Sequence, residues 1–269
     1  MGEAASRLTR DGLLGGRITI AQPASGYRAG TDSLLLAAAV PARRGERVLE
    51  AGLGTGAAAL ALLSRVPECR VVGIESEAGH AALARGNAAG NGLADRLDVM
   101  CCDIMDATVE YLKSRGVPAG FGHAMANPPY YEKGRVRAPA DASRRAAHLG
   151  EAGTLALWVA RLGDAVRGAG TVTVIHRAGM LDELTAAFRR HVGGPVVLPI
   201  AARAGEDATR VIVQARKGTR SPARLMAPLV LHLEDGAYGP GAELVLRGGA
   251  QLDLSTAPAA IVPGGGSAA

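Results

Sequence analysis

Four consecutive residues, Asn127-Pro128-Pro129-Tyr130, have the groups needed to hold a planar amine while its nitrogen reacts. An amine conjugated to a ring or a carbonyl is a poor nucleophile, because its lone pair is delocalised. The side-chain oxygen of Asn127 and the main-chain carbonyl of Pro128 can accept its two N–H bonds, and the prolines fix these acceptors in advance. Tyr130 offers a ring on which a base can stack. We expect these four residues to form the catalytic centre, without a metal ion.

A glycine-rich segment, Glu50-Ala51-Gly52-Leu53-Gly54-Thr55-Gly56, lies between an apolar run and an Ala/Leu-rich run. Glycines here let the chain turn tightly and approach a ligand closely. The third glycine comes one position earlier than in the GxGxxG loop that binds pyrophosphate. The GxGxG spacing, preceded by the acid Glu50, resembles the S-adenosylmethionine loop of Rossmann-like methyltransferases. A carboxylate suits a ligand with a cationic amino-acid end and no phosphates.

Two further acids close the next two predicted strands, Glu75 and Asp103. A carboxylate at the first position can accept both hydroxyls of a ribose, and one at the second can accept from an adenine amino group. Either acid alone would be better explained as a solvated helix cap. Three acids after three successive strands instead predict a nucleoside-like cofactor held by Glu50, Gly52, Gly54, Gly56, Glu75 and Asp103, with Asn127 beside it.

Short β-branched runs alternate with Ala/Leu-rich stretches, which is typical of βαβ units and a parallel sheet. The predicted strands are Arg47–Gly52, Arg70–Glu75, Leu97–Asp103, His123–Asn127, Thr171–Arg177, Val196–Ala202 and Arg210–Arg216. The predicted helices are Thr55–Arg65, Ser76–Asn91, Met105–Arg115, Glu151–Arg167 and Gly179–His191. The fold class is therefore α/β, with a seven-stranded, mostly parallel sheet, helices on both faces and a reversed last strand.

The motifs also resemble one family over nearly the whole chain, roughly residues 9–254: the bacterial tRNA1(Val) adenine-N6 methyltransferases. The resemblance rests on Asp11–Arg17, Gln22-Pro23, Gly26–Arg28, Gly30–Asp32, Leu35–Ala38, Asn87 with Asn91, and Asn127–Tyr130 with Tyr131. It implies a Rossmann-like class I methyltransferase fold, S-adenosylmethionine as cofactor, and the purine 3′ of a tRNA anticodon as substrate. It also implies that Thr31 and Asp32 line the cofactor pocket. The chain departs from the family pattern at Gly122-His123, where an acid is common, and in its longer C-terminal third.

A basic stretch follows the catalytic tetrapeptide. Its residues are Tyr131, Lys133, Arg135, Arg137, Arg144 and Arg145. Cations beside a base-binding pocket suit the phosphate backbone of a tRNA partner. A solvated surface loop is the alternative, since charge runs usually have no other role. The net charge of +5 favours a polyanionic partner in the same way.

The cysteines and the apolar runs of the sequence indicate the compartment in which the protein is located. Three cysteines, Cys69, Cys101 and Cys102, lack metal-ligand spacing and indicate free thiols in a reducing compartment. The start of the chain lacks a secretory signal and no run is long enough for a membrane helix, so we expect a cytoplasmic protein without membrane contact. The sequence does not predict the oligomeric state. We divide the chain into an N-terminal segment with a helix packed on the core (1–46), a methyltransferase domain (47–255) and a flexible tail (256–269).

Two alternative functions share parts of this pattern. A protein-glutamine N5-methyltransferase of the release-factor type carries the same tetrapeptide, but it also has a helical N-terminal domain for which too few residues precede the glycine loop. The other alternative is a non-catalytic RNA-binding protein on the same fold, against which Glu50, Asn127 and Tyr130 argue. His123, His176 and Trp158 are interpreted as core or structural residues.

Overall fold

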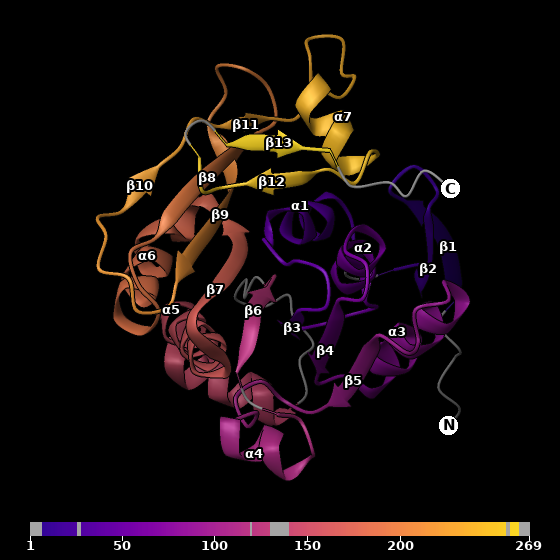
Figure 1. Ribbon diagram of the computed structural model, residues 1–269, viewed down its shortest axis with the longest axis vertical. Helices are drawn as coiled ribbons and strands as arrows, with labels where there is room; N and C mark the ends of the chain where they lie inside the picture. The colour runs from indigo at the N-terminus through magenta and orange to yellow at the C-terminus, as the bar shows by residue number, and fades with distance from the viewer. Residues whose placement is uncertain (1–6, 26–27, 119, 130–139, 257–258, 264–269) are drawn as a thin grey trace.

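Nine strands form the central sheet within the part of the chain that the structure describes (Figure 1). This structure is a computed structural model describing residues 7–25, 28–118, 120–129, 140–256 and 259–263, and the side chains of 140–152 are not described. In spatial order the strands are β10 (Arg224–Leu225), β8 (Val196–Ala201), β9 (Ala208–Arg216), β7 (Val166–Arg177), β6 (Phe121–Ala126), β3 (Arg47–Ala51), β4 (Arg70–Glu75) and β5 (Leu97–Cys101). The ninth, β11 (Leu229–Val230), also pairs with β8.

The strand directions confirm the predicted sheet. Strands β5, β4, β3, β6 and β7 are parallel, and β9 runs antiparallel between β7 and β8. These seven strands are the predicted ones, and the antiparallel strand, β9, comes last of the seven in the sequence. The two-residue strands β10 and β11 come in addition to these seven, and two residues carry too little of an alternation pattern to predict their bounds.

Helices cover both faces of the sheet (Figure 1). One face carries α1 (Thr31–Ala39), α2 (Ala57–Arg65) and α3 (Ala78–Gly90). The other carries α4 (Val109–Ser114), α5 (Ala140–Ala165) and α6 (Leu181–His191), the last after a short 3-10 turn, η1 (Ala178–Met180). Leu35, Leu60 and Met125 lie in the first core, and Leu49, Trp158 and Phe188 in the second. Since both faces are covered, the strands are apolar on both sides, as parallel strands usually are.

Two helix bounds differ from the prediction by more than two residues. The helix expected at Met105–Arg115 begins only at Val109, because the Thr108 side chain accepts the main-chain N–H of Tyr111 at 3.1 Å and caps the helix there. The helix expected from Glu151 begins already at Ala140.

Two hairpins complete the structure. The first, β1 (Leu8–Leu13) with β2 (Ile18–Pro23), precedes α1 and was not predicted as a hairpin. The second, β12 (Gln251–Asp253) with β13 (Ala260–Val262), lies near α7 (Pro240–Leu246), and both β12 and α7 pack on α1 (Figure 1). The prediction of a flexible tail from residue 256 is therefore wrong for β13, since Ile261 packs against the core of the α1 face. Residues 264–269 lie outside the described residues.

A helix with the length and hydropathy of a membrane span does not occur in the part of the chain that the structure describes. In these same ranges, His, Cys, Asp and Glu side chains nowhere gather in a group of three suited to a metal ion.

Candidate active site

The parallel strands end together at one edge of the sheet, which we call the carboxyl edge. There β3 continues into the glycine loop, where Gly52, Gly54 and Gly56 have φ angles of +70°, +56° and +89°. These values lie in the left-handed region that only glycine adopts without strain. The N–H groups of Gly52 and Leu53 both donate to the carbonyl of Ile74 on β4, at 2.9 and 3.0 Å. The loop glycines predicted from the sequence are therefore required by the backbone itself.

Open space lies over the middle of this loop. A Cβ added to Gly54 would meet no atom within 4 Å, whereas one added to Gly52 would lie 2.9 Å from Cη2 of Trp158. Trp158 comes from α5 and is buried, so the prediction of a core residue is confirmed. Its ring supports the underside of the loop, a role that its position in an Ala/Leu-rich helix did not suggest. The loop is thus packed at Gly52 and open at Gly54, where a ligand can approach the main chain.

Glu50 is a buried carboxylate directly before the glycine loop. It is only 3% exposed, and its Oε2 has no hydrogen-bond partner among the described residues. Burial raises the pKa of Glu50 well above its usual value, the N–H of Ala59 lowers it, and the charge of Glu75 raises it further. A buried unpartnered carboxylate oxygen is costly unless a ligand supplies a donor. The cationic amino-acid end of S-adenosylmethionine fits this requirement.

Glu75 ends β4, as predicted, and its carboxylate also shapes the loop. Its Oε2 accepts the N–H of Gly54 at 2.7 Å, and its Oε1 accepts the N–H of Glu77 at 2.8 Å. Each carboxylate oxygen has two lone pairs, so both can still accept a ligand hydroxyl. The contact with Gly54 was not predicted, because it joins residues 21 positions apart through a side chain.

Asp103 follows β5 by two residues and is half-buried. Its Oδ1 accepts the N–H of Met105 at 2.9 Å, which fixes the turn after the strand. In the sheet, Ala51 pairs with Ile74 and Glu75 pairs with Cys101. The three acids therefore lie at the ends of neighbouring strands, at one edge of the sheet.

The tetrapeptide begins at the same edge. Ala126, the last residue of β6, pairs with Ala51 of β3, so Asn127 begins beside the glycine loop. Asn127 is half-buried, Pro128 is buried and Pro129 is exposed. Tyr130, Tyr131, Lys133, Arg135 and Arg137 lie outside the described residues, and Arg144 and Arg145 fall in the part of α5 whose side chains are not described.

Thr31 and Asp32 form the first turn of α1. Thr31 is half-buried. The carboxylate of Asp32 accepts from Nε of Arg210 at 2.9 Å, an ion pair that ties α1 to the start of β9. This link spans 178 positions of the sequence and was not predicted.

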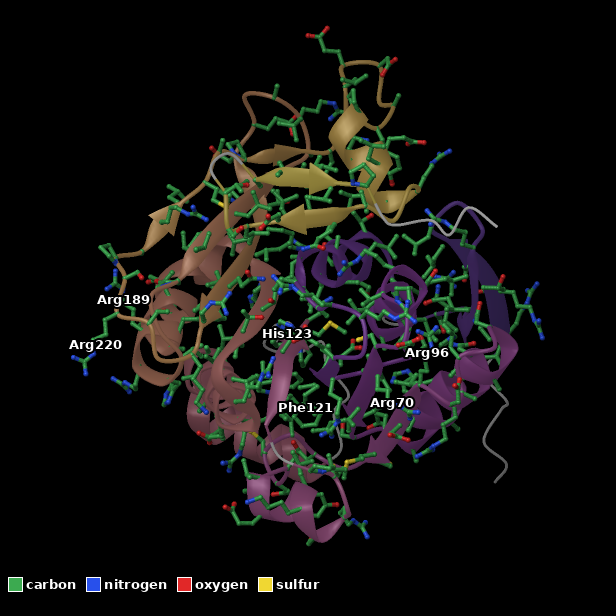
Figure 2. All side chains as sticks on the ribbon, in the orientation of Figure 1. Arg70, Arg96, Phe121, His123, Arg189 and Arg220 are labelled. Carbon is green, nitrogen blue, oxygen red and sulfur yellow. The ribbon has the colours of Figure 1, made fainter. Side chains whose placement is uncertain are left out.

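Two buried histidines lie at opposite edges of the sheet. His123 is near the start of β6 (Figure 2). Its Nδ1 contacts the Thr171 hydroxyl at 2.7 Å, and its Nε2 contacts Glu46 at 2.9 Å. Burial lowers the pKa of His123. His176 lies near the carboxyl end of β7, where burial lowers its pKa to about 4. His123 is therefore remote from the tetrapeptide, in agreement with its interpretation as a core residue.

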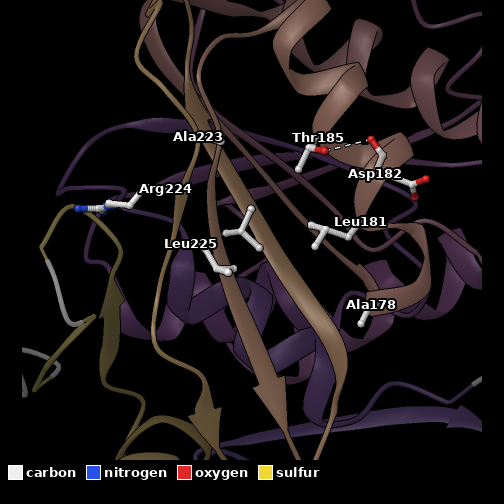
Figure 3. A pocket seen from close by; sticks show the side chains of 8 residues that line it. Ala178, Leu181, Asp182, Thr185, Ala223, Arg224 and Leu225 are labelled. Carbon is white, nitrogen blue, oxygen red and sulfur yellow. Dashed lines mark hydrogen bonds between the residues drawn. The ribbon is translucent and has the colours of Figure 1, made fainter.

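A separate pocket of about 500 Å³ lies between α6 and β10 (Figure 3). It is lined by Ala178, Leu181, Asp182, Thr185, Val197, Ala223, Arg224 and Leu225. None of the residues predicted to bind the cofactor lines it, so it is not part of the candidate active site.

Known proteins resemble this chain in sequence and in fold. A family model described as a methyltransferase domain matches residues 48–121. A tRNA1(Val) (adenine(37)-N6)-methyltransferase from Aeromonas hydrophila is 31% identical over 216 residues, covering 78% of this chain and 85% of that protein. A protein of the same name from Porphyromonas gingivalis is 29% identical over 238 residues, covering 83% and 89%. The crystal structure of a predicted O-methyltransferase from Agrobacterium tumefaciens is 27% identical with a TM-score of 0.67, covering 81% of this chain and 96% of that one.

The fold and these matches define a Rossmann-like methyltransferase that uses S-adenosylmethionine. The open loop and the buried Glu50 oxygen fit that cofactor. The chain belongs to the family of the tRNA1(Val) (adenine(37)-N6)-methyltransferases. The family and the cofactor predicted from the sequence are thereby confirmed.

Proposed function

We propose that this enzyme transfers a methyl group to N6 of an adenine in a tRNA, at position 37 of tRNA1(Val). The relatives named for this reaction support the substrate. The observation that carries the chemistry is the register of β6 with β3, which starts the tetrapeptide beside the glycine loop. A substrate amine held by Asn127 would therefore lie next to the cofactor.

The residues of the tetrapeptide would act on the geometry of the amine. When bound, S-adenosylmethionine supplies an electrophilic methyl group on its sulfonium. The Asn127 side-chain oxygen and the Pro128 carbonyl accept the two N6–H bonds, which directs the nitrogen lone pair at that methyl. Pro128 and Pro129 restrict the backbone, so the acceptors need no rearrangement. Tyr130 stacks on the adenine.

The reaction balances without a metal ion or a redox partner. The N6 lone pair forms the new bond to the methyl carbon as the bond from that carbon to sulfur breaks, and the sulfur keeps the electron pair. The N6 nitrogen, briefly cationic, then loses one proton to water. A strong base is not required, because the methylated nitrogen is acidic before the proton leaves.

The substrate's backbone would pass over the basic stretch after the tetrapeptide. Its members are Tyr131, Lys133, Arg135, Arg137, Arg144 and Arg145. Contacts of its lysine and four arginines with phosphates would make tRNA binding weaken as salt is raised. We assign the methyltransferase reaction to residues 47–255 and the place of action to the cytoplasm, where tRNA is modified.

The direct test is methyl transfer from labelled S-adenosylmethionine to unmodified tRNA1(Val), with nucleoside analysis of the product. We expect N6-methyladenosine with the wild type and none with a tRNA that carries guanine at position 37. Asn127→Ala should lower the rate at least about a thousandfold, since it removes a preorganised acceptor and misplaces the nucleophile. Transfer to ribosomal RNA or to a release-factor glutamine, with none to tRNA, would overturn the substrate but keep the chemistry.

A further inference from the structure

Two asparagines, Asn87 in α3 and Asn91 at the C-terminal end of that helix, bind the outer edge of β2 in the N-terminal hairpin. The side-chain oxygen of Asn87 accepts the N–H of Ala21 at 2.7 Å, and its Nδ2 donates to the carbonyl of Ala21 at 2.9 Å. Asn91 makes the same pair of bonds with Thr19, at 2.9 and 2.7 Å. Thr19 and Ala21 are alternate residues of β2, and these main-chain groups face away from β1. The two amides, one helical turn apart, therefore replace a neighbouring strand.

Only one of these asparagines also contacts the cofactor loop. Nδ2 of Asn87 donates a second hydrogen bond, to the carbonyl of Thr55, at 2.9 Å. Thr55 lies between Gly54 and Gly56. The additional bond of Asn91 goes instead to the carbonyl of Asn87, within its own helix. Asn87 is 5% exposed, so the loop contact is shielded from water.

The hairpin also holds the chain that leads into α1. Gln22 of β2 is buried; its Nε2 donates to Asp11 at 2.9 Å and its Oε1 accepts the N–H of Ala29 at 2.9 Å. Ala29 immediately precedes the turn that starts α1 at Thr31. The hairpin is thus bonded to two segments of the carboxyl edge, one through Gln22 and the other through Asn87.

The backbone of the glycine loop keeps one conformation only if residues outside the loop restrain it. Glycine populates left-handed and right-handed conformations about equally, so a loop with three left-handed glycines has many competing shapes. Two side chains restrain its central residues: Glu75 accepts from Gly54, and Asn87 donates to Thr55. They bind adjacent residues from a strand and from a helix. Together they fix the orientation of the loop where it is open to a ligand.

We propose that Asn87 is a positioning residue for the cofactor site, which couples the N-terminal hairpin to the glycine loop through the carbonyl of Thr55. With this bond in place, the loop is held in its binding shape before the cofactor arrives. The binding free energy of the cofactor is then not reduced by the entropy lost in ordering the loop. Asn91 contributes equally to the hairpin but has no part in this coupling.

Asn91 is therefore the matched control. Asn91→Ala and Asn87→Ser each remove two hydrogen bonds to β2, and both should lower the melting temperature. In the Asn87→Ser protein the shorter serine hydroxyl would not reach Thr55, and the space left by the amide admits water. Asn87→Asp is the isosteric variant: its carboxylate accepts from the N–H of Ala21 but can donate neither to the carbonyl of Ala21 nor to that of Thr55.

The measurement is the dissociation constant of S-adenosylhomocysteine, the demethylated cofactor, by calorimetry with the full chain. We expect Asn87→Asp and Asn87→Ser to raise it about tenfold, the cost of losing the one buried hydrogen bond to the loop, and Asn91→Ala to leave it within about twofold. In steady state, KM for S-adenosylmethionine should rise more than kcat falls. Thermal unfolding separates loss of stability from loss of affinity in each variant.

Three results would overturn the coupling. The first is an unchanged dissociation constant in a folded Asn87→Ser protein. The second is an equal rise in the Asn91→Ala protein, which would mean that the hairpin acts only through stability. The third is failure of every Asn87 variant to fold while Asn91→Ala folds normally, which would make Asn87 a residue of the fold rather than of the site.

Discussion

The main-chain N–H of Gly54 donates to Oε2 of Glu75 at 2.7 Å, which joins the glycine loop after β3 to the carboxylate at the end of β4. The other oxygen of Glu75 accepts the N–H of Glu77. The two main-chain donors fix the position of this buried carboxylate. One side chain can therefore both hold the loop and present two oxygens to a ribose.

Glu75→Gln should weaken binding of S-adenosylhomocysteine about tenfold to a hundredfold. A glutamine has one acceptor oxygen, so its NH2 group faces one of the two main-chain donors and cannot accept that bond. Calorimetry checks this, with Glu77→Gln as the control, because the side chain of Glu77 is exposed. Equal affinities of the Glu75→Gln and wild-type proteins would contradict the double role.

The loop glycines should respond differently to the same substitution. Gly52→Ala combines a left-handed φ with a Cβ 2.9 Å from Trp158, and should cost about 2 to 4 kcal/mol of the free energy of unfolding. Gly54→Ala adds a Cβ in open space, so it should cost only about 1 to 2 kcal/mol for its φ.

Gly54→Ala should weaken cofactor binding more than Gly52→Ala does, although it lowers the free energy of unfolding less. The methyl group added by Gly54→Ala would project into the space where a ligand approaches the main chain. This variant should therefore raise the dissociation constant of S-adenosylhomocysteine more than its loss of stability explains. Urea unfolding and calorimetry on both variants test this. A Gly54→Ala protein with normal affinity would show that the open space is not part of the cofactor site.

Much of the sheet could be predicted because its signals are local. Buried parallel strands have continuous apolar runs, and their ends coincide with the polar residues Glu50, Glu75 and Asn127. Parallel strands that alternate with helices must place those ends at one edge, so the sequence order already brought the acids and the tetrapeptide together.

The contacts that complete the site left no local signal. The bond from Asn87 to Thr55 spans 32 positions, and the ion pair of Asp32 with Arg210 spans 178. Such partners depend on how helices pack on the sheet, which periodicity does not encode. The hairpin of β1 and β2 was missed for a related reason: its turn begins with Leu14 at a φ of +52°, a conformation that leucine rarely adopts.

Cofactor affinity should rise with pH because of Glu50. Burial keeps the pKa of this carboxyl well above its usual value in the free enzyme, and only the ionised form pairs with the ammonium of the cofactor. As pH rises through that pKa, the cost of ionising Glu50 disappears and S-adenosylhomocysteine binds more tightly. Below it, binding releases a proton, so the measured enthalpy should depend on the ionisation enthalpy of the buffer.

Glu50→Gln is the control for this dependence. It should bind at least about tenfold more weakly at high pH and lose the slope at pH values above the ordinary glutamate pKa of about 4.3, since the amide carries no charge at any pH. A wild-type protein whose affinity is flat over that range, with no buffer-dependent enthalpy, would contradict the assignment of the ammonium to Glu50.

The stability of the protein should fall in mild acid because of His176. Burial and the charges of Arg177 and Arg210 lower the pKa of this histidine to about 4, whereas an unfolded chain gives about 6.5. Between these values the unfolded state binds a proton that the folded state does not, so the free energy of unfolding decreases as pH falls from about 6.5 to about 4. Above that window both states are neutral and His176 adds no pH dependence.

The full effect of His176 amounts to about 3 kcal/mol, from about 1.4 kcal/mol for each pKa unit. Urea unfolding at about pH 7, 5.5 and 4.5 measures it, and the same series on His176→Phe subtracts every other titrating group, because phenylalanine has no proton to gain. The wild type should lose stability relative to the variant as pH falls. A constant difference between the two proteins across the three pH values would mean that His176 is protonated as easily in the folded chain as in the unfolded one.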